Sequence, residues 1–261
     1  MLTPANVALG CVGWEGLNRV VTLLIGRAVD AGVVLPAGSS EKLRAQGASY
    51  AVSLVHAIIL SVRGVWHVLS LLSAPTTAQL SIPDNADDPY HAAAAATEAT
   101  NIIFLSYLMY DLLHVLGAFP KLGGADTVAH HAGFIGASLV CGSHRILPFA
   151  FSWLVCGEIS SIPLNVRWFL LTSGRGESTA LRATNLAFAG SFFLARVLVY
   201  GLGLWHLWAT REPLLALERL VARPLLLLVI VLLVGGYGLN LAWMRKIAAM
   251  ATKKTGRKRA D

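Results

Sequence analysis

The sequence is poor in charged residues. Only 13% of its 261 residues are Asp, Glu, Lys or Arg, and the mean hydropathy is +0.63. A soluble domain is about a quarter charged, and an outer-membrane barrel would show short segments of alternating polarity, which are lacking here. These absences exclude both classes and indicate an all-α integral membrane protein.

The sequence lacks three residue patterns that would indicate a specific chemistry: cysteine pairs, lysines inside the apolar runs, and repeated histidine clusters. Cys11, Cys141 and Cys156 form no Cys-X-X-Cys pair and lie in apolar runs, so we expect them to pack in the core. No lysine lies inside an apolar run, which excludes a retinal Schiff base. The repeated histidine clusters of di-iron desaturases are also missing.

Seven apolar runs approach the roughly 20 residues that a helix needs to cross a bilayer. They cover residues 5–26, 48–72, 99–119, 125–143, 146–171, 182–209 and 223–244. The sequence therefore predicts a polytopic transmembrane helical bundle of about seven spans. We expect residues 1–47 to form the first span and a cytosolic loop, residues 48–247 the main domain, and residues 248–261 a basic cytosolic tail.

Basic residues are distributed unevenly between the two sides of this bundle. Thirteen lysines and arginines fall on the side of the C-terminal tail and four on the other side. Because cytosolic loops carry an excess of these residues, we expect a lumenal N-terminus and a cytosolic C-terminus. The net charge of +7 then reflects topology, and no nucleic-acid partner is expected.

Polar residues inside the first two spans follow helical spacing. In the first span Glu15 and Arg19 lie four residues apart, where an ion pair is expected. In the second span His56, Arg63 and His67 are separated by seven and four residues and share one stripe. A charge at the bilayer centre costs about 2.5–3.5 kcal/mol, so we expect this stripe to face the bundle interior.

The third and fourth spans bring a carboxylate and two histidines to similar depth. Tyr107, Asp111 and His114 share one face of the third span, which ends at a proline and two glycines. The fourth span then reaches His130 and His131 within its first turn or so. We therefore predict that Asp111 faces the histidine pair across a tight hairpin.

The remaining polar residues lie in the fifth and sixth spans. Pro148 and Pro163 should break the fifth span, and the carbonyl freed by Pro163 lies close to Glu158. Asn165 follows on the same side, with Arg167 at the cytosolic end. The sixth span carries Arg196. The seventh has no charged residue over Pro224–Trp243, and we expect it to face lipid or to pack against the bundle, with Trp243 as an interfacial anchor.

Five short motifs in this order resemble the TLC-domain family, the multi-pass endoplasmic-reticulum proteins that include the ceramide synthases. They are Tyr110-Asp111, His130-His131, Glu158-Ile159-Ser160, Asn165-Val166-Arg167, and Phe192-Phe193 followed by Arg196. The resemblance runs from Ser53 to Lys246 and implies a TLC domain over residues 48–247. It also implies about six helices around a lipid-sized tunnel that contains the histidine pair.

The sequence departs from the ceramide synthases downstream of the histidine pair. The synthases carry a longer signature there that ends in two aspartates three residues apart, whereas this sequence has the single acid Glu158. The pattern is closer to the smaller, non-synthase TLC-domain proteins, which are linked to phospholipid composition, membrane fluidity and cargo export. This favours a role in phospholipid and sphingolipid homeostasis in the endoplasmic-reticulum membrane.

Two functions stay open. In the first, the bundle binds a lipid or acyl chain at an intramembrane polar site, with membrane lipids or cargo proteins as partners. In the second, it is an acyl-CoA-dependent N-acyltransferase in which His130 or His131 acts as base or nucleophile and Asp111 orients the imidazole. No cofactor is required, and acyl-CoA is expected only as a substrate, with its phosphates at Arg167.

Further contacts to the substrate are expected from the polar residues inside the spans: His56, Arg63, Tyr107, His114, Glu158, Asn165, Arg167 and Arg196. No metal is expected. A metal held by Asp111, His130 and His131, or a haem held by two histidines, is the alternative by ligand type. Oligomerisation stays open.

Overall fold

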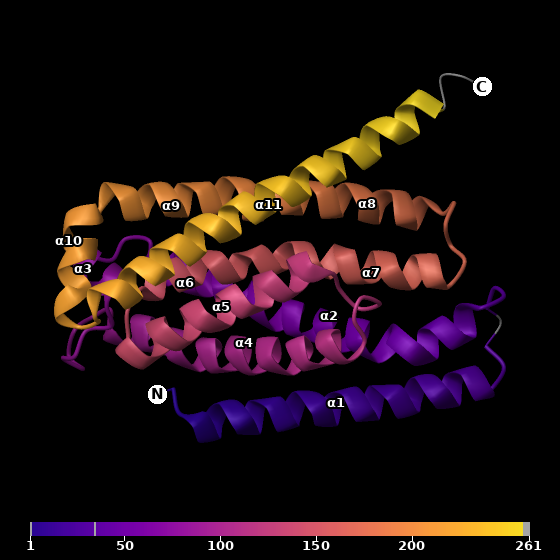
Figure 1. Ribbon diagram of the computed structural model, residues 1–261, viewed down its shortest axis with the longest axis horizontal. Helices are drawn as coiled ribbons and strands as arrows, with labels where there is room; N and C mark the ends of the chain where they lie inside the picture. Colours follow the sequence, from indigo (N-terminus) through magenta and orange to yellow (C-terminus); the bar gives the residue numbers. More distant parts are fainter. Residues whose placement is uncertain (1, 34, 258–261) are drawn as a thin grey trace.

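The computed structural model describes residues 2–33 and 35–257, with the backbone alone for residues 251–257. Residues 258–261 of the expected basic tail lie outside the described residues. The long helices lie roughly side by side, and successive spans alternate in direction, with α6 and α7 forming one span and α8 and α9 another (Figure 1). They are α1 (Pro4–Asp30), α2 (Ser39–Leu71), α4 (His91–Gly117), α5 (Ala125–His144), α6 (Pro148–Val155), α7 (Ser161–Thr172), α8 (Thr179–Phe192), α9 (Tyr200–Ala209) and α11 (Arg223–Arg257).

The predicted helical transmembrane bundle is confirmed. Six helical segments are long and apolar enough to cross a membrane, namely α1, α2, α4, α6 through α7, α8 through α9, and α11. The expected fourth span, α5, falls outside this set, and its residues include Asp126, His130, His131 and His144. It nevertheless packs between α4 and α11 and lies alongside α4 (Figure 1).

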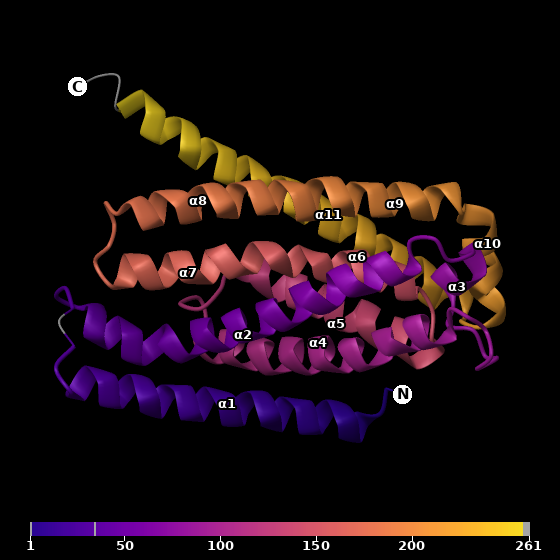
Figure 2. The same ribbon diagram turned by 180° about the vertical axis from the view of Figure 1, so that it is seen from behind.

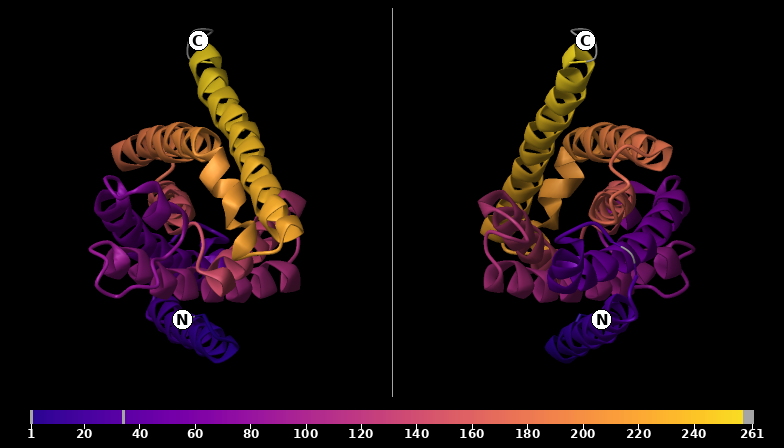
Figure 3. Two further views of the ribbon diagram at one scale, coloured as in Figure 1. Left: turned by 90° about the vertical axis from the view of Figure 1, so that its left-hand side faces the viewer. Right: turned by 90° about the vertical axis from the view of Figure 1, so that its right-hand side faces the viewer.

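Three helices extend further than the apolar runs indicate. Helix α4 begins at His91, whereas its apolar run begins at residue 99. Helix α2 begins at Ser39, so much of the loop expected before residue 48 is helical, and Arg44 forms an ion pair with Asp30 at the end of α1. Helix α11 continues to Arg257 and leaves the bundle obliquely, with its C-terminal end projecting beyond the other helices (Figures 1 and 3). These helices therefore include polar residues beyond the ends of their apolar runs.

Helix α1 lies along one edge of the molecule, next to α2 and α4 (Figure 2). The Thr3 hydroxyl caps its first turn by accepting the amide N–H of Asn6 at 3.2 Å, and Pro4 occupies the first turn. The expected pair of Glu15 and Arg19 is confirmed, with 2.7 Å between Arg19 Nε and Glu15 Oε1. Most side chains of α1 are exposed, so α1 is the peripheral helix of the bundle.

The fifth span is interrupted just before Pro163, as predicted, whereas Pro148 begins its first helix and the break predicted there is wrong. Pro148 begins α6, the 3₁₀ segment η1 (Cys156–Ser160) follows, and Pro163 lies in the first turn of α7. The sixth span is also irregular, because the π-helical segment η2 (Phe193–Val199) joins α8 to α9. The two irregular segments contact each other. Backbone that departs from the α-helical conformation therefore occurs side by side in the fifth and sixth spans.

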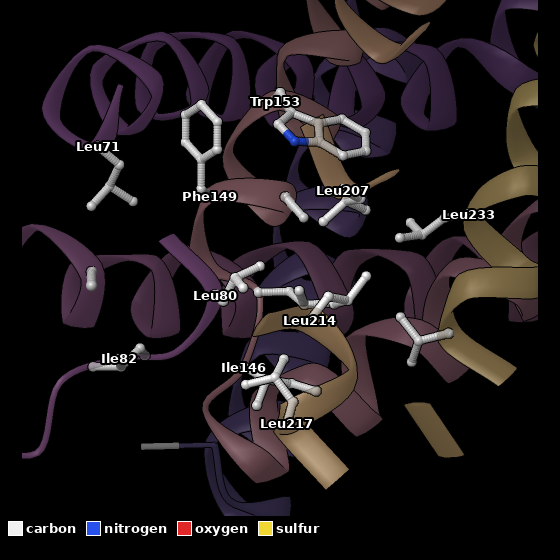
Figure 4. Close-up of a cluster of buried hydrophobic side chains, with 14 of the residues drawn as sticks. Leu71, Leu80, Ile82, Ile146, Phe149, Trp153, Leu207, Leu214, Leu217 and Leu233 are labelled. Atoms are coloured by element: carbon white, nitrogen blue, oxygen red, sulfur yellow. The ribbon is translucent and has the colours of Figure 1, made fainter. Parts of the chain in front are cut away.

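Short helices close the end of the bundle that is opposite the C-terminus. They are α3 (Thr76–Leu80), α10 (Arg211–Leu215) and the 3₁₀ segment η3 (Ala216–Arg219). Their apolar side chains pack against those of α6, α9 and α11 in the larger hydrophobic core (Figure 4). Phe149 and Trp153 of α6 lie in this core together with Leu80, Leu207 and Leu214. A packed core therefore fills this end, and the cavity described below lies toward the other end.

The close packing of α6 against α9 depends on a glycine. A Cβ atom at Gly203 would collide with the ring of Trp153, whereas one at Gly190 in α8 would meet no atom within 4 Å. We expect Gly203→Ala to destabilise the protein by about 1–3 kcal/mol through overpacking, and Gly190→Ala to change stability little. Unfolding of both variants in non-ionic detergent measures this. Equal stability of the two variants would contradict the packing described here.

Candidate functional site

The side chains of Asp111 and His131 join α4 to α5 across a short turn. Asp111 Oδ2 lies 2.9 Å from His131 Nε2, and the side chains are 18% and 10% exposed. His131 Nδ1 donates to the carbonyl oxygen of Thr127, one turn earlier in α5, at 2.9 Å. The predicted match in depth between Asp111 and the histidine pair is therefore confirmed for His131.

This arrangement engages both ring nitrogens of His131. A carbonyl oxygen only accepts, so Nδ1 carries a hydrogen, and the contact of Nε2 with a carboxylate needs a second shared proton. The pair is thus a charge-assisted hydrogen bond that connects two helices. It differs from a triad, in which the imidazole keeps one nitrogen free for the substrate.

The ring of His130 has a different environment. It lies about 100° further round α5 and packs against Phe134 and Trp243, with ring centroids 4.7 and 5.3 Å away. Its nitrogens make no hydrogen bond to any residue in the described part of the chain. Of the two adjacent histidines, His130 is therefore the one whose ring nitrogens can meet a ligand.

A second charged pair joins the two irregular segments. Arg196 Nη2 donates to Glu158 Oε1 at 3.1 Å, and both side chains are less than one-fifth exposed, at 11% and 16%. Arg196 Nε donates to the Gly157 carbonyl at 3.1 Å and to Ser160 Oγ at 2.9 Å. These acceptors belong to residues of the 3₁₀ segment η1, and Arg196 belongs to the π-helical segment η2. Such π segments recur at functional sites.

A cavity of about 780 Å³ lies beside both charged pairs. It reaches the surface where the exposed side chains of Lys246 and Met250 line it. Its walls come from α5, η1, α7, α8, η2 and α11. The lining residues are Thr127, His130, His131, Ser160, Ser161, Leu164, Arg167, Asn185, Phe188, Ala189, Phe192, Arg196, Trp243, Lys246, Ile247 and Met250.

The predicted site residues divide into three groups. His130, His131, Arg167 and Arg196 line the cavity. Asp111 and Glu158 lie directly behind it, as partners of His131 and Arg196. The expected binding residues outside the cavity lining are His56, Arg63, Tyr107, His114 and Asn165.

The stripe on α2 faces the interior, as predicted, but it meets α4. His56 is buried and stacks on Tyr107 with ring centroids 3.6 Å apart. Arg63 Nε and His67 Nε2 lie 2.6 and 2.7 Å from the hydroxyl of Thr100. These stacking and hydrogen-bond contacts connect α2 to α4.

The other two residues outside the lining also connect helices. His114 turns toward α1, where its Nε2 lies 3.1 Å from Glu15 Oε2. Asn165 Nδ2 donates to Ser53 Oγ of α2 at 3.1 Å and to the Ser161 carbonyl at 2.8 Å. Both contacts join neighbouring helices outside the cavity lining.

Sequence reasoning missed the contribution of α11. The indole N–H of Trp243 donates to Asp126 Oδ2 at 3.0 Å, and Lys246 Nζ lies 3.5 Å from the same oxygen. Trp243 was expected to be an interfacial anchor. It lines the cavity and connects α11 to the start of α5. The sequence signal that could have indicated this contact is the opposite charge of Asp126, in the first turn of α5, and Lys246, just after the last apolar run.

The metal alternative finds no support in this geometry. Among residues 2–33 and 35–257, no three His, Cys, Asp or Glu side chains are grouped as metal ligands. Asp111 contacts His131, whereas the ring of His130 turns toward Trp243.

The comparison with protein families identifies the chain. The model of the TLC domain matches residues 48–249, most of the chain. The chain belongs to the TLC-domain family. The resemblance inferred from the sequence motifs is thereby confirmed, and with it a multi-pass membrane protein of a family linked to lipids.

Comparison with curated proteins gives a partial relative. The chain is similar to TLC domain-containing protein 4-B of Danio rerio, with 27% identity over 114 residues. This match covers 43% of the chain and 43% of that protein, so the chain spans less than half of its relative's length in the match. No solved structure matches the chain.

The Asp111–His131 pair generates a prediction about stability. We expect Asp111→Asn to lower the free energy of unfolding by about 1.5–3 kcal/mol, the contribution of a hydrogen bond to a charged group. The control is Asp84→Asn, which removes an exposed contact to Arg145 at 3.4 Å and should cost at most about 1 kcal/mol. Denaturation in mixed detergent micelles measures both variants. A loss at Asp111 no larger than that at Asp84 would refute a connecting role for the pair.

Proposed function

We propose that this TLC-domain protein binds a membrane lipid through its acyl chain in the cavity between α5, α7, α8 and α11, and that it acts in membrane-lipid homeostasis. The observation that carries the proposal is the composition of the cavity wall. Leu164, Phe188, Phe192, Ile247 and Met250 provide an apolar surface, and a smaller number of polar groups, the histidine pair among them, line the rest of the wall. A pocket with apolar walls and a few converging polar groups suits an amphiphile.

The endoplasmic-reticulum membrane is the proposed location, with the N-terminus in the lumen and the C-terminus in the cytosol. The family membership and the excess of Lys and Arg at the C-terminal side support this placement. The cavity then opens toward the cytosolic leaflet, because Lys246 and Met250 lie at the end of α11 that leads to the C-terminus. The lipids of that leaflet are the proposed partners.

Blocking the cavity tests lipid binding. Ala189 lines the cavity, whereas Ala187 is exposed on the other side of α8, so Ala189→Trp and Ala187→Trp form a matched pair. We expect the protein purified in detergent to retain lipid that native mass spectrometry detects. Retention should fall at least fivefold in Ala189→Trp and stay unchanged in Ala187→Trp. Equal retention in the two variants, or no lipid in the unaltered protein, would rule out the proposed function.

A second function is acyl-CoA-dependent N-acyl transfer, and the free ring of His130 favours it. The amine of the acceptor would attack the thioester carbonyl, so that a C–N bond forms and the C–S bond breaks. His130 would take the proton from the amine and return it to the leaving thiolate. His131 is less suited to this role, because both of its ring nitrogens are engaged.

Substitution of His130 tests the second function. If the protein catalyses this reaction, His130→Ala should lower the rate of amide formation by roughly 10²–10⁴-fold, the usual contribution of a general base. Retention of bound lipid should be unchanged. The assay supplies oleoyl-CoA and a long-chain amine to the purified protein and measures amide by mass spectrometry. Absence of amide with the unaltered protein, or an equal rate in the variant, would exclude this function.

A further inference from the structure

The charges around the cavity are unequal in sign. Three basic side chains, Arg167, Arg196 and Lys246, line the cavity, and no acidic residue is found among the described lining residues. Two of the three bases are neutralised from outside the lining. Glu158 contacts Arg196 at 3.1 Å, and Asp126 lies 3.5 Å from Lys246. Arg167 is therefore the basic side chain whose charge needs a different partner.

Arg167 makes one polar contact to the described part of the chain. Its Nε donates to the amide oxygen Oδ1 of Asn185 at 2.8 Å, and this neutral acceptor fixes the plane of the guanidinium. A guanidinium has five N–H donors, so the four on Nη1 and Nη2 are left. These donors form a planar fork that matches two oxygens of a phosphate or a carboxylate. The contact to Asn185 orients this fork and leaves it unoccupied by the residues that the structure describes.

The position of Arg167 along the bundle suits a headgroup. It lies five residues before the end of α7, and Asn185 lies six residues after the start of α8. At 1.5 Å per residue, both are roughly 8 Å inside their helix ends. The headgroup region of a bilayer is about 5–7 Å thick on each side. Arg167 therefore lies near the level at which headgroups meet hydrocarbon.

Apolar side chains continue the cavity from this point. Phe188 and Phe192 follow Asn185 on the same face of α8, and Leu164 precedes Arg167 by one turn of α7. Ile247 and Met250 of α11 line the cavity as well. A ligand that contacts Arg167 with its headgroup would place its hydrocarbon chain along these side chains.

We propose that the cavity takes an acyl-chain amphiphile whose headgroup carries a net negative charge on phosphate or carboxylate oxygens, and that Arg167 receives this headgroup. The inference rests on the proposed lipid-binding function and names its ligand class. A zwitterionic lipid would bring its own cation, which no acidic lining residue receives. The expected preference is therefore for anionic over zwitterionic lipid.

A competition experiment tests the preference. The full-length protein in non-ionic detergent is offered equal amounts of phosphatidylglycerol and phosphatidylcholine with identical acyl chains, and native mass spectrometry counts the lipids retained. A parallel arm replaces phosphatidylglycerol with oleate, so that phosphate and carboxylate headgroups are compared. The unaltered protein should retain the anionic lipid in excess. Excess in either arm supports the proposal and identifies the oxyanion.

Variants assign the preference to Arg167. Arg167→Gln should lower the anionic-to-zwitterionic ratio roughly tenfold or more, the factor expected for a hydrogen bond between charged groups. Arg175→Gln is the matched control, because Arg175 is exposed in the loop between α7 and α8 and does not line the cavity. Its ratio should equal that of the unaltered protein. Arg167→Lys keeps the charge without the fork and should lower the ratio by a smaller factor.

The outcomes separate this inference from the function on which it rests. Lipid retained without preference for the anionic headgroup, or a ratio unchanged in Arg167→Gln, would overturn the role of Arg167 and leave lipid binding standing. If Arg167→Gln does not fold, an unchanged ratio in Arg167→Lys overturns it instead. Absence of any retained lipid in the unaltered protein would refute the proposed function itself.

Discussion

Two pairs of oppositely charged side chains lie inside this bundle, and each pair joins two segments. Asp111 and His131 connect α4 to α5, and Glu158 and Arg196 connect η1 to η2. An unpaired charge in a membrane interior costs several kcal/mol, so each pair strongly favours one arrangement of its two segments. Interhelical hydrogen bonds in membranes otherwise contribute only about 0.6 kcal/mol on average. The pairs therefore specify the geometry of the cavity wall more than they add stability.

The same requirement decides which side chains are left for a ligand. Pairing engages both ring nitrogens of His131 and most of the hydrogen-bonding capacity of Arg196. It leaves the ring of His130 and the terminal nitrogens of Arg167 facing the cavity. His131 and Arg196, which have the most polar contacts to the protein, thus hold the cavity wall together. His130 and Arg167, which have the fewest, are the residues that can bind a ligand. This division favours lipid binding and keeps His130 as the base for acyl transfer.

Much of the fold and part of the site could be predicted from sequence. Apolar runs located the spans to within a few residues at most ends, and Pro163 indicated the break in the fifth span. The depth match of Asp111 and His131 followed from the short turn, because a tight hairpin places residues equally far from the turn side by side. The roles of Trp243 and Lys246 could not be predicted, since α11 is far from α5 in sequence and its direction across the bundle depends on packing.

What the sequence by itself determined is the bundle of helices, the family, and the inward-facing stripe of α2. Helical periodicity defines a direction relative to the helix's own axis, but it does not say which neighbour lies in that direction. His56 and Arg167 both face inward, yet His56 stacks on α4 while Arg167 lines the cavity. Only the tertiary structure decided between a contact that joins helices and a group open to a ligand, because that depends on how distant helices pack.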